Sequence, residues 1–369
     1  MQTILNTIKS FTWQQGLMIL VGIVLIYLAI KKEMEPSLLL PLGFGVVLVN
    51  IPGSGAIETL RILFDAGCGE SELFPLLLFI GIGAMIDFGP LLSNPKMLLF
   101  GGAAQFGIFF TLMVAVLLGF SVQDAASTAI IAAADGPTAI FVSNYFKSGL
   151  GGAVVVAAYS YMALVPMIQP PVIKLMTTKK ERMIRMSYVQ REVPQVIKII
   201  FPVVVTIVAG IVAPKSISLV GFLMYGNLLR ECGVLRSISE TAQTALSHIV
   251  TIFLGITVAF QMRAESFVRW DTLLVLALGL LGFVFDTIGG VLFAKFLNLF
   301  LKKENRFNPM IGAAGISAFP MSSRVVSKMA RDEDPYNFIL MQATAVNVSG
   351  QIASVIAGGL LVSLVDALL

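Results

Sequence analysis

Charged residues are scarce in this sequence. Asp, Glu, Lys and Arg make up 12% of its 369 residues, whereas hydrophobic residues make up 57%. A soluble domain carries about 25% charged residues, so this composition excludes an ordinary soluble globular protein. The apolar runs are long and continuous rather than alternating, which argues against a β-barrel. The composition therefore predicts an all-α polytopic membrane protein.

Residues that bind transition metals or carry redox chemistry are also few. The chain has one histidine, His248, and two cysteines, Cys68 and Cys232. No ligand pattern surrounds His248, so a metal site of the His/Cys kind is not supported. The cysteines could form at most one disulfide, and small buried core residues are the simpler interpretation. Met1–Ser10 has mixed polarity and is followed by an apolar run long enough to span, so we expect no cleavable signal.

Long hydrophobic runs fill most of the chain and occur in two similar series. The first series is Gly16–Ile30, Leu38–Ile51, Phe74–Asp87, Met97–Phe120, Ala125–Phe146 and Ala153–Met176. The second series is Val196–Ala213, Ser218–Leu229, Ala245–Phe260, Thr272–Leu301, Met310–Met329 and Phe338–Val365. In the first half, the stretch Ile57–Leu73 between the second and third runs is more polar and predicts an amphipathic helix with a loop. Because the two series follow one order at a nearly constant offset, the sequence predicts two structural repeats.

The charges in the loops predict the topology. We divide the chain into a first membrane repeat (1–176), a basic loop (177–195) and a second membrane repeat (196–369). The loop and Lys31-Lys32 are both predicted to be cytoplasmic by the positive-inside rule, and no nucleic-acid role is needed to explain these basic residues. Five apolar segments lie between the two, so one is predicted to be re-entrant or only to dip into the membrane. The candidates are Leu38–Ile51 and the broken segment, and the repeats are then inverted. Lys302, Lys303 and Arg306 agree with this topology, whereas Arg263 and Arg269 do not.

One apolar segment is broken in its middle by Asp135-Gly136-Pro137, within IIAAADGPTAIFVSN (130–144). Lipid offers no water to a freed backbone, so such a break requires protein or a polar cavity around it. A carboxylate at membrane depth costs roughly 3 kcal/mol or more. An acid on a helix break is a common way to build a cation site in a membrane. The simpler alternative is a kinked helix whose Asp lies in water at its end.

The second repeat is broken at the corresponding place, within Met310–Met329, and we expect the two breaks to meet near mid-membrane. Half-helices there would present dipole ends and free carbonyls to a small ion. Oxygen-bearing side chains surround both breaks and suit sodium, a hard cation. They are Thr138, Ser143, Asn144, Tyr161, Asn308, Ser317, Ser322, Ser323, Gln342, Thr344, Asn347, Ser349 and Gln351.

Two further charged residues lie within apolar segments. Asp286 holds about the position of Gln105 in the first repeat, and either burial against a neighbouring helix or a function would explain it. The guanidinium of Arg324 keeps its charge and binds carboxylates through two parallel hydrogen bonds. It could pair with Asp135, hold an anionic substrate, or extend to the membrane interface. The spacing alone does not choose among these roles.

Five long motifs resemble one family of membrane proteins. The motifs are GIGAMIDFGPLLSNPK (81–96), AAADGPTAIFVSNYF (132–146), AAYSYMALVPMIQPP (157–171), NPMIGAAGISAFPMSSRV (308–325) and NVSGQIAS (347–354). They are similar to the beta subunits of sodium-pumping biotin-dependent decarboxylases, which act on oxaloacetate, methylmalonyl-CoA, glutaconyl-CoA or malonate. The resemblance covers nearly the whole chain, from about Gly16 to its end.

The resemblance implies a subunit that decarboxylates carboxybiotin and couples this reaction to sodium export. A biotin carrier protein would deliver the carboxybiotin, and the fold would be an inverted repeat with an elevator-like motion. The implied partners are a carboxyltransferase (alpha) subunit, the biotin carrier, a small single-span gamma or delta subunit, membrane lipid and further copies of the chain. The implied location is the inner (plasma) membrane of a bacterium or archaeon, as a multi-pass protein.

The resemblance also implies a set of site residues. Asp135, Tyr161 and Arg324 would be catalytic, with Tyr161 as proton donor or relay. Sodium would bind at Asp135, Asn308, Ser317 and Asn347, and the substrate at Arg324 and Gly312. The alternatives are a sodium/proton antiporter or other elevator-type secondary transporter, and a non-catalytic scaffold. A scaffold would have little reason to carry Asp135, Asp286 and Arg324 in apolar segments.

Overall fold

The structure is a computed structural model that describes residues 10–69, 71–186 and 192–368. The expectation for Met1–Ser10 falls outside these residues apart from Ser10, as does part of the basic loop, including Arg191. The first half contains α2 (Trp13–Lys31), α3 (Pro36–Val49), α4 (Ala56–Cys68), α5 (Leu73–Met85), α6 (Gly89–Ser93), η1 (Pro95–Met97), α7 (Leu98–Ala104), α8 (Phe106–Leu117), α9 (Val122–Ala129), η2 (Ile130–Ala133), α10 (Gly136–Tyr145) and α11 (Gly151–Met176).

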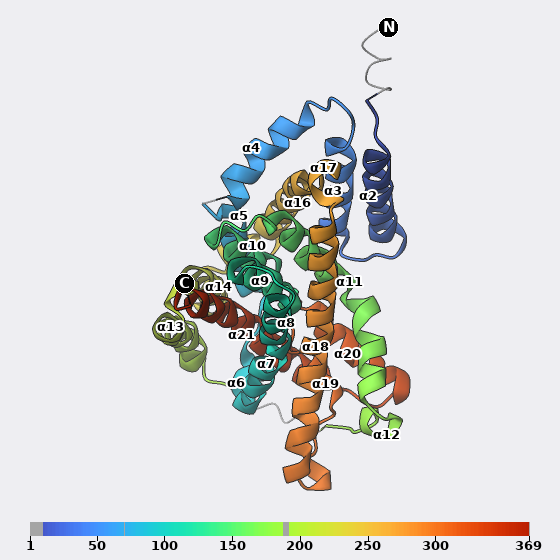
Figure 1. The fold of residues 1–369 in the computed structure, drawn as a ribbon. Helices are drawn as coiled ribbons and strands as arrows, with labels where there is room; N and C mark the ends of the chain where they lie inside the picture. The colour runs from blue at the N-terminus through green and yellow to red at the C-terminus, as the bar shows by residue number, and fades with distance from the viewer. Residues whose placement is uncertain (1–9, 70, 187–191, 369) are drawn as a thin grey trace.

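The second half follows a short helix α12 (Lys179–Arg182). It contains α13 (Gln195–Val212), η3 (Pro214–Ser216), α14 (Ile217–Glu231), α15 (Arg236–Thr241), η4 (Ala242–Leu246), α16 (Ser247–Val258), η5 (Ala259–Met262), α17 (Ala264–Phe267), α18 (Trp270–Phe300), η6 (Lys303–Asn305), α19 (Met310–Ala313), α20 (Met321–Glu333) and α21 (Leu340–Asp366). Figure 1 shows α18 running along much of the length of the molecule.

Seven helical segments in the described residues are long and apolar enough to cross a membrane. They are Trp13–Lys31, Pro95–Leu117, Gly151–Met176, Gln195–Val212, Arg236–Met262, Trp270–Phe300 and Leu340–Asp366. The pair α4 and α5, bent by 58° at its break, would make an eighth, and α3 is a shorter apolar helix. The prediction of an all-α polytopic membrane protein is therefore confirmed.

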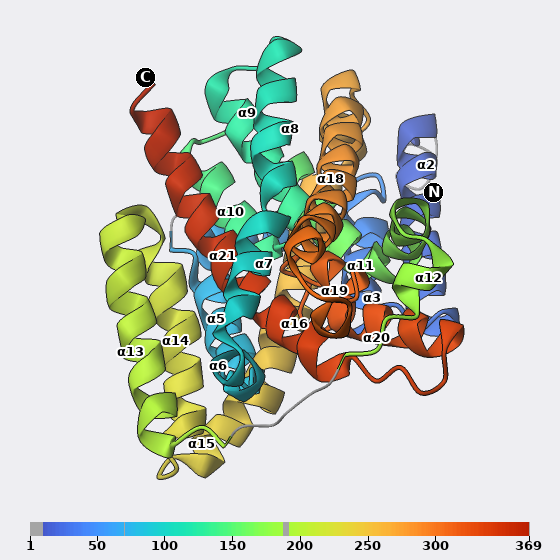
Figure 2. The same cartoon turned by 90° about the horizontal axis from the view of Figure 1, so that it is seen from below.

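The apolar helices differ in how deeply they lie inside the protein. In the most apolar stretch of each helix, 72% of the residues are buried in α21, but only 11% in α13 and 17% in α2. Figure 2 shows α13 beside α14 along one edge of the molecule. Because their exposed faces are apolar, α2 and α13 suit a lipid environment, whereas α21 belongs to the protein interior.

Helices from one half of the chain pack on helices from the other half in matched pairs. The helix α5 packs on α14, and α16 packs on α3. In the same way, α11 packs on α18, and α21 packs on α7. The two halves are therefore interleaved, and these four pairs each join a helix of one half to a helix of the other.

The crossing of α5 and α14 depends on two glycines. A Cβ added at Gly83 would overlap the carbonyl oxygen of Leu223, and one added at Gly226 would overlap that of Ile80. Small residues let helix backbones approach this closely in membrane proteins.

We expect Gly83→Ala to destabilise the protein by about 1–3 kcal/mol, because backbone cannot move aside as a side chain can. The measurement is the apparent Tm of the purified protein in detergent. Gly102→Ala in α7 is the matched control, since a Cβ there meets nothing within 4 Å, and it should leave the Tm unchanged or slightly raised. Equal Tm values for the two variants would contradict the close crossing.

The expected span Met97–Phe120 is interrupted at Gln105, between α7 and α8. Asp286 of α18 compensates for this break, because its carboxylate accepts a hydrogen bond from the backbone N–H of Gly107 at the start of α8. Asp286 is fully buried. Of the two explanations left open by the sequence, the structure places Asp286 against a neighbouring helix, where it caps freed backbone.

Candidate functional site

The first break lies between η2 and α10. Ala134 adopts a left-handed conformation with φ of 51°, which ends the helical run. Asp135 then serves as the N-cap of α10, and its carboxylate accepts a hydrogen bond from Thr138 N at 3.3 Å. Pro137 fits the first turn of α10, where its missing N–H has no partner to lose. The motif Asp135-Gly136-Pro137 is therefore a helix start rather than a kink.

The second break lies between α19 and α20, at residues 314–320. Ser317 in this break donates its backbone N–H to the carbonyl of Ala133 at 3.1 Å. The two broken segments are thus hydrogen-bonded to each other directly. Gln105 also contacts the second break, donating from Nε2 to the carbonyl of Gly315 at 3.3 Å.

Side chains from the second break and from α21 surround the Asp135 carboxylate. Oδ2 accepts hydrogen bonds from Ser317 Oγ at 2.9 Å and from Ser354 Oγ at 2.8 Å. Gln351 Nε2 lies 3.4 Å from the same oxygen. Asp135 is only 3% exposed, and the described residues place no ion pair on it. Its negative charge is therefore solvated by hydroxyl and amide groups alone.

Asn347 connects the same cluster to α21. Its Nδ2 donates to the carbonyl of Ile316 at 2.8 Å, next to Ser317. Its Oδ1 is buried and has no hydrogen-bond partner in the described part of the chain. A buried amide oxygen without a partner is rare in native proteins, so this oxygen is available to a bound group.

A cavity of about 280 Å³ adjoins the Asp135 cluster. Its walls come from both breaks, from α3, α5, α11 and α16, and from α20 and α21. Asp135, Ser317 and Arg324 all line it. Arg324 is exposed and forms no ion pair among the described residues. The cavity therefore combines a buried carboxylate with an accessible guanidinium, and Glu35 on the same wall lies within reach of its charge.

Sequence reasoning did not single out several other residues of the cavity wall. Glu35 and His248 line it, from the start of α3 and from α16. Tyr159 of α11 lines it as well, and its ring lies against Gly136, where a Cβ would overlap the ring. The lone histidine lacked ligand spacing, and Glu35 lies in a polar connection, so neither had a local signal in the sequence.

Tyr161 lies on a different side of α11. Its hydroxyl donates to the carbonyl of Leu276 on α18 at 2.6 Å, and it is not among the residues lining the cavity. Residues two apart on an α-helix differ by about 200° in direction, so Tyr159 and Tyr161 cannot face the same site. The role of Tyr161 as a proton relay stays a prediction from the resemblance.

Asn308 and Gly312 also lie apart from the Asp135 cluster. Asn308 donates from Nδ2 to the carbonyls of Arg182 and Ile184, at 2.8 and 2.9 Å. Gly312 packs against the backbone of Gly290, where a Cβ would overlap its carbonyl oxygen. The structure does not bring either residue to Asp135, so their sodium and substrate roles remain predictions from the resemblance.

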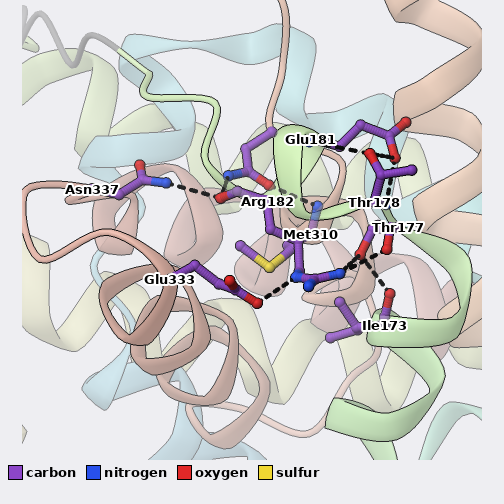
Figure 3. Close-up of polar contacts among 9 residues, drawn as sticks. Ile173, Thr177, Thr178, Glu181, Arg182, Met310, Glu333 and Asn337 are labelled. Atoms are coloured by element: carbon purple, nitrogen blue, oxygen red, sulfur yellow. Dashed lines mark hydrogen bonds and ion pairs between the residues drawn. The ribbon is translucent and has the colours of Figure 1, made fainter.

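The segment that Asn308 holds is the described part of the basic loop. Figure 3 shows the Arg182 side chain between Thr177 and Glu333. The carbonyl of Arg182 also accepts from Asn337 at 3.0 Å. The neighbouring Arg185 pairs with Asp334 at 2.6 Å, and its guanidinium holds the pKa of Asp334 below the ordinary value. The guanidinium groups of Arg182 and Arg185 are therefore tied to the end of α20.

The cluster can hold a hard cation with a single charged ligand. It offers the Asp135 carboxylate, the unpaired Asn347 Oδ1 and the Ser317 and Ser354 hydroxyls, all oxygen atoms. Such atoms suit a hard cation rather than a transition metal. Arg324, on the same cavity, offers paired donors to a carboxylate.

Comparisons with known proteins agree with the motifs. A family model described as "Na+-transporting oxaloacetate decarboxylase beta subunit" matches residues 14–365. The chain is 48% identical to the methylmalonyl-CoA decarboxylase subunit beta of Veillonella parvula, over 97% of this chain and 95% of that protein. It is 46% identical to the glutaconyl-CoA decarboxylase subunit beta of Acidaminococcus fermentans, over 96% and 94%. It is 42% identical to a probable oxaloacetate decarboxylase beta chain of Vibrio cholerae, over 99% and 100%.

Proposed function

Because this chain belongs to the beta subunits of Na+-transporting decarboxylases, we propose that it decarboxylates carboxybiotin and couples that reaction to sodium export. The family resemblance expected from the motifs is confirmed. The chain is a membrane subunit of a sodium-translocating decarboxylase and a multi-pass protein of the bacterial plasma membrane.

One observation carries the proposal. A single cavity is lined by a buried carboxylate and by an exposed guanidinium, and neither has an ion-pair partner in the described residues. Burying an unpaired carboxylate is costly unless a cation or hydrogen bonds compensate. A site that takes one cation and one anionic substrate together would use both groups.

On the sodium side, Asp135 supplies the charge that balances the cation. Ser317, Ser354 and Asn347 supply neutral oxygen atoms from two other segments. The unpaired Asn347 Oδ1 supports this assignment, because sodium would give it the partner it lacks. For Asn308, the support is the family resemblance alone.

On the substrate side, Arg324 would bind the carboxylate of carboxybiotin through two parallel hydrogen bonds. Decarboxylation breaks the N–C bond, releases CO2 and leaves the ring nitrogen to take up a proton. Arg324 holds the carboxylate before this step and loses its anionic partner afterwards. Tyr161 would donate or relay this proton, and the support for that role is the family resemblance alone, because its hydroxyl donates to the carbonyl of Leu276 in the structure.

We further propose that the two halves of the chain are inverted repeats that move as in an elevator-type transporter. The matched packing of α5 on α14 and of α16 on α3 supports the repeats. Loss of the substrate carboxylate would shift the equilibrium between two forms of the protein, because a ligand acts through its differential affinity for each. Decarboxylation at Arg324 would in this way be coupled to movement of the sodium ion bound at Asp135.

The partners follow from membership of a multi-subunit family. As the beta subunit of a multi-subunit decarboxylase, the chain would work with an alpha subunit and a biotin carrier that brings the carboxylated cofactor. We also propose a small gamma or delta subunit and further copies of this chain in the assembly. The acyl substrate would be chosen by the alpha subunit, because this chain meets only carboxybiotin.

The proposal is tested with the purified full chain in detergent and in proteoliposomes. We expect free carboxybiotin to be decarboxylated only when sodium is present, with sodium moving across the proteoliposome membrane. Potassium at equal ionic strength is the control. If sodium instead exchanges for protons without any carboxybiotin, the antiporter interpretation is correct and this function is wrong.

A further inference from the structure

The hydroxyl of Tyr159 is buried without a hydrogen-bond partner. Tyr159 is 1% exposed, and in the described part of the chain its Oη has no partner. A phenylalanine would fill the same space between α11 and α10, so packing does not require the oxygen atom. Buried polar atoms left unpaired are few in native proteins, and each one needs an explanation.

The surroundings of Tyr159 indicate what could pair with it. The residue lines the same cavity as Asp135 and Ser317, and its ring lies against Gly136, the neighbour of Asp135. The unpaired Oδ1 of Asn347 belongs to the polar cluster around the same carboxylate. Unpaired oxygen atoms gathered around a buried carboxylate are the arrangement that a bound hard cation would complete.

We propose that the Tyr159 hydroxyl is an oxygen ligand of the sodium ion held at Asp135. This inference rests on the proposed function, and it adds a residue that the family motifs did not assign to the site. A phenolic oxygen carries lone pairs that can face a hard cation while its proton points away. The rigid ring fixed against Gly136 keeps that oxygen in place before the ion arrives.

Tyr161 provides the contrast that makes the proposal testable. Its hydroxyl already donates to Leu276 O at 2.6 Å, so it has the partner that Tyr159 lacks. Removing the two hydroxyls should therefore have opposite consequences. Tyr159→Phe removes an unpaired group and leaves nothing behind, whereas Tyr161→Phe leaves a carbonyl without its donor.

The experiment is a sodium titration of the apparent Tm for the full chain in detergent, with choline replacing sodium at constant ionic strength. For Tyr159→Phe, we expect the sodium concentration at half of the Tm shift to rise roughly tenfold, the equivalent of about 1.4 kcal/mol. Its Tm in choline should equal or exceed that of the wild type. For Tyr161→Phe, we expect a lower Tm in choline and an unchanged sodium midpoint.

Two results would overturn the proposal. One is a wild-type sodium midpoint for Tyr159→Phe. The other is a fall of its Tm in choline as large as that of Tyr161→Phe, which would reveal a structural partner for the hydroxyl. If the Tm of the wild-type chain does not change when sodium replaces choline, the result counts against the sodium site itself. In that case the proposed function fails together with this ligand. The wild-type response thus tests the proposed function, and the Tyr159→Phe midpoint tests the ligand.

Discussion

Asp135→Asn is expected to abolish sodium-dependent turnover while leaving a folded protein in the membrane. The amide keeps the size of the side chain and its capping of α10, because Asn is as good an N-cap as Asp. It removes the negative charge that Ser317 and Ser354 now surround. Losing the charge of a buried pair costs about 2 kcal/mol or more, equivalent to a loss of about 30-fold or more in sodium affinity. The measurements are sodium uptake into proteoliposomes and decarboxylation of free carboxybiotin against sodium concentration.

Asp286→Asn is the matched control for this result. Asp286 is equally buried, but it caps Gly107 at the start of α8 and lies outside the cavity. We expect this variant to lose some thermal stability and to keep its sodium dependence. Near-normal sodium coupling in Asp135→Asn would remove Asp135 from the site, whatever the behaviour of the control.

Arg324→Ala is expected to weaken the use of free carboxybiotin much more than the binding of sodium. A hydrogen bond to a charged group contributes about 1.5–3 kcal/mol, so kcat/KM for carboxybiotin should fall by roughly 10- to 150-fold. Arg324→Lys should restore only part of this loss, because an ammonium group cannot form the two parallel hydrogen bonds of a guanidinium. The measurement is steady-state decarboxylation at saturating sodium, with sodium binding followed by the shift in Tm.

Lys328→Ala serves as the control for Arg324→Ala. Lys328 lies one turn further along α20 and lines a different cavity. It should leave the kinetics close to those of the wild type, which separates a bound carboxylate from a general loss of positive charge. If Arg324→Ala altered only the affinity for sodium, Arg324 would be a structural partner of the cation site rather than a substrate ligand.

Much of the fold could be predicted because membrane-spanning helices require long apolar runs, which are visible in the sequence. Long apolar runs matched the helices α2, α11, α13, α18 and α21 closely. The break at Asp135-Gly136-Pro137 was also visible, since acid, glycine and proline together cannot continue an apolar helix. The break inside Met97–Phe120 was missed because Gln105 is a good helix former, and the cap that makes the break tolerable comes from Asp286 on α18.

The candidate site was harder to predict, because it depends on which way each side chain points. Tyr159 and Tyr161 share one motif, and only the rotation of α11 tells which of them lines the cavity. Asn308 lies close in sequence to the second break, yet its amide binds the backbone of Arg182 and Ile184. Long-range partners of this kind leave no local trace in a sequence.

The hydrogen bond from Ser317 N to the Ala133 carbonyl has a consequence for how ions enter and leave. It links the two interrupted helices, so either one can move away from the other only by breaking this backbone hydrogen bond. The helices α3 and α16 also line the cavity, so we expect an exit for the ion to open on their side. In such a transport step, the two breaks would move together with the bound ion, and the helices around them would open the path.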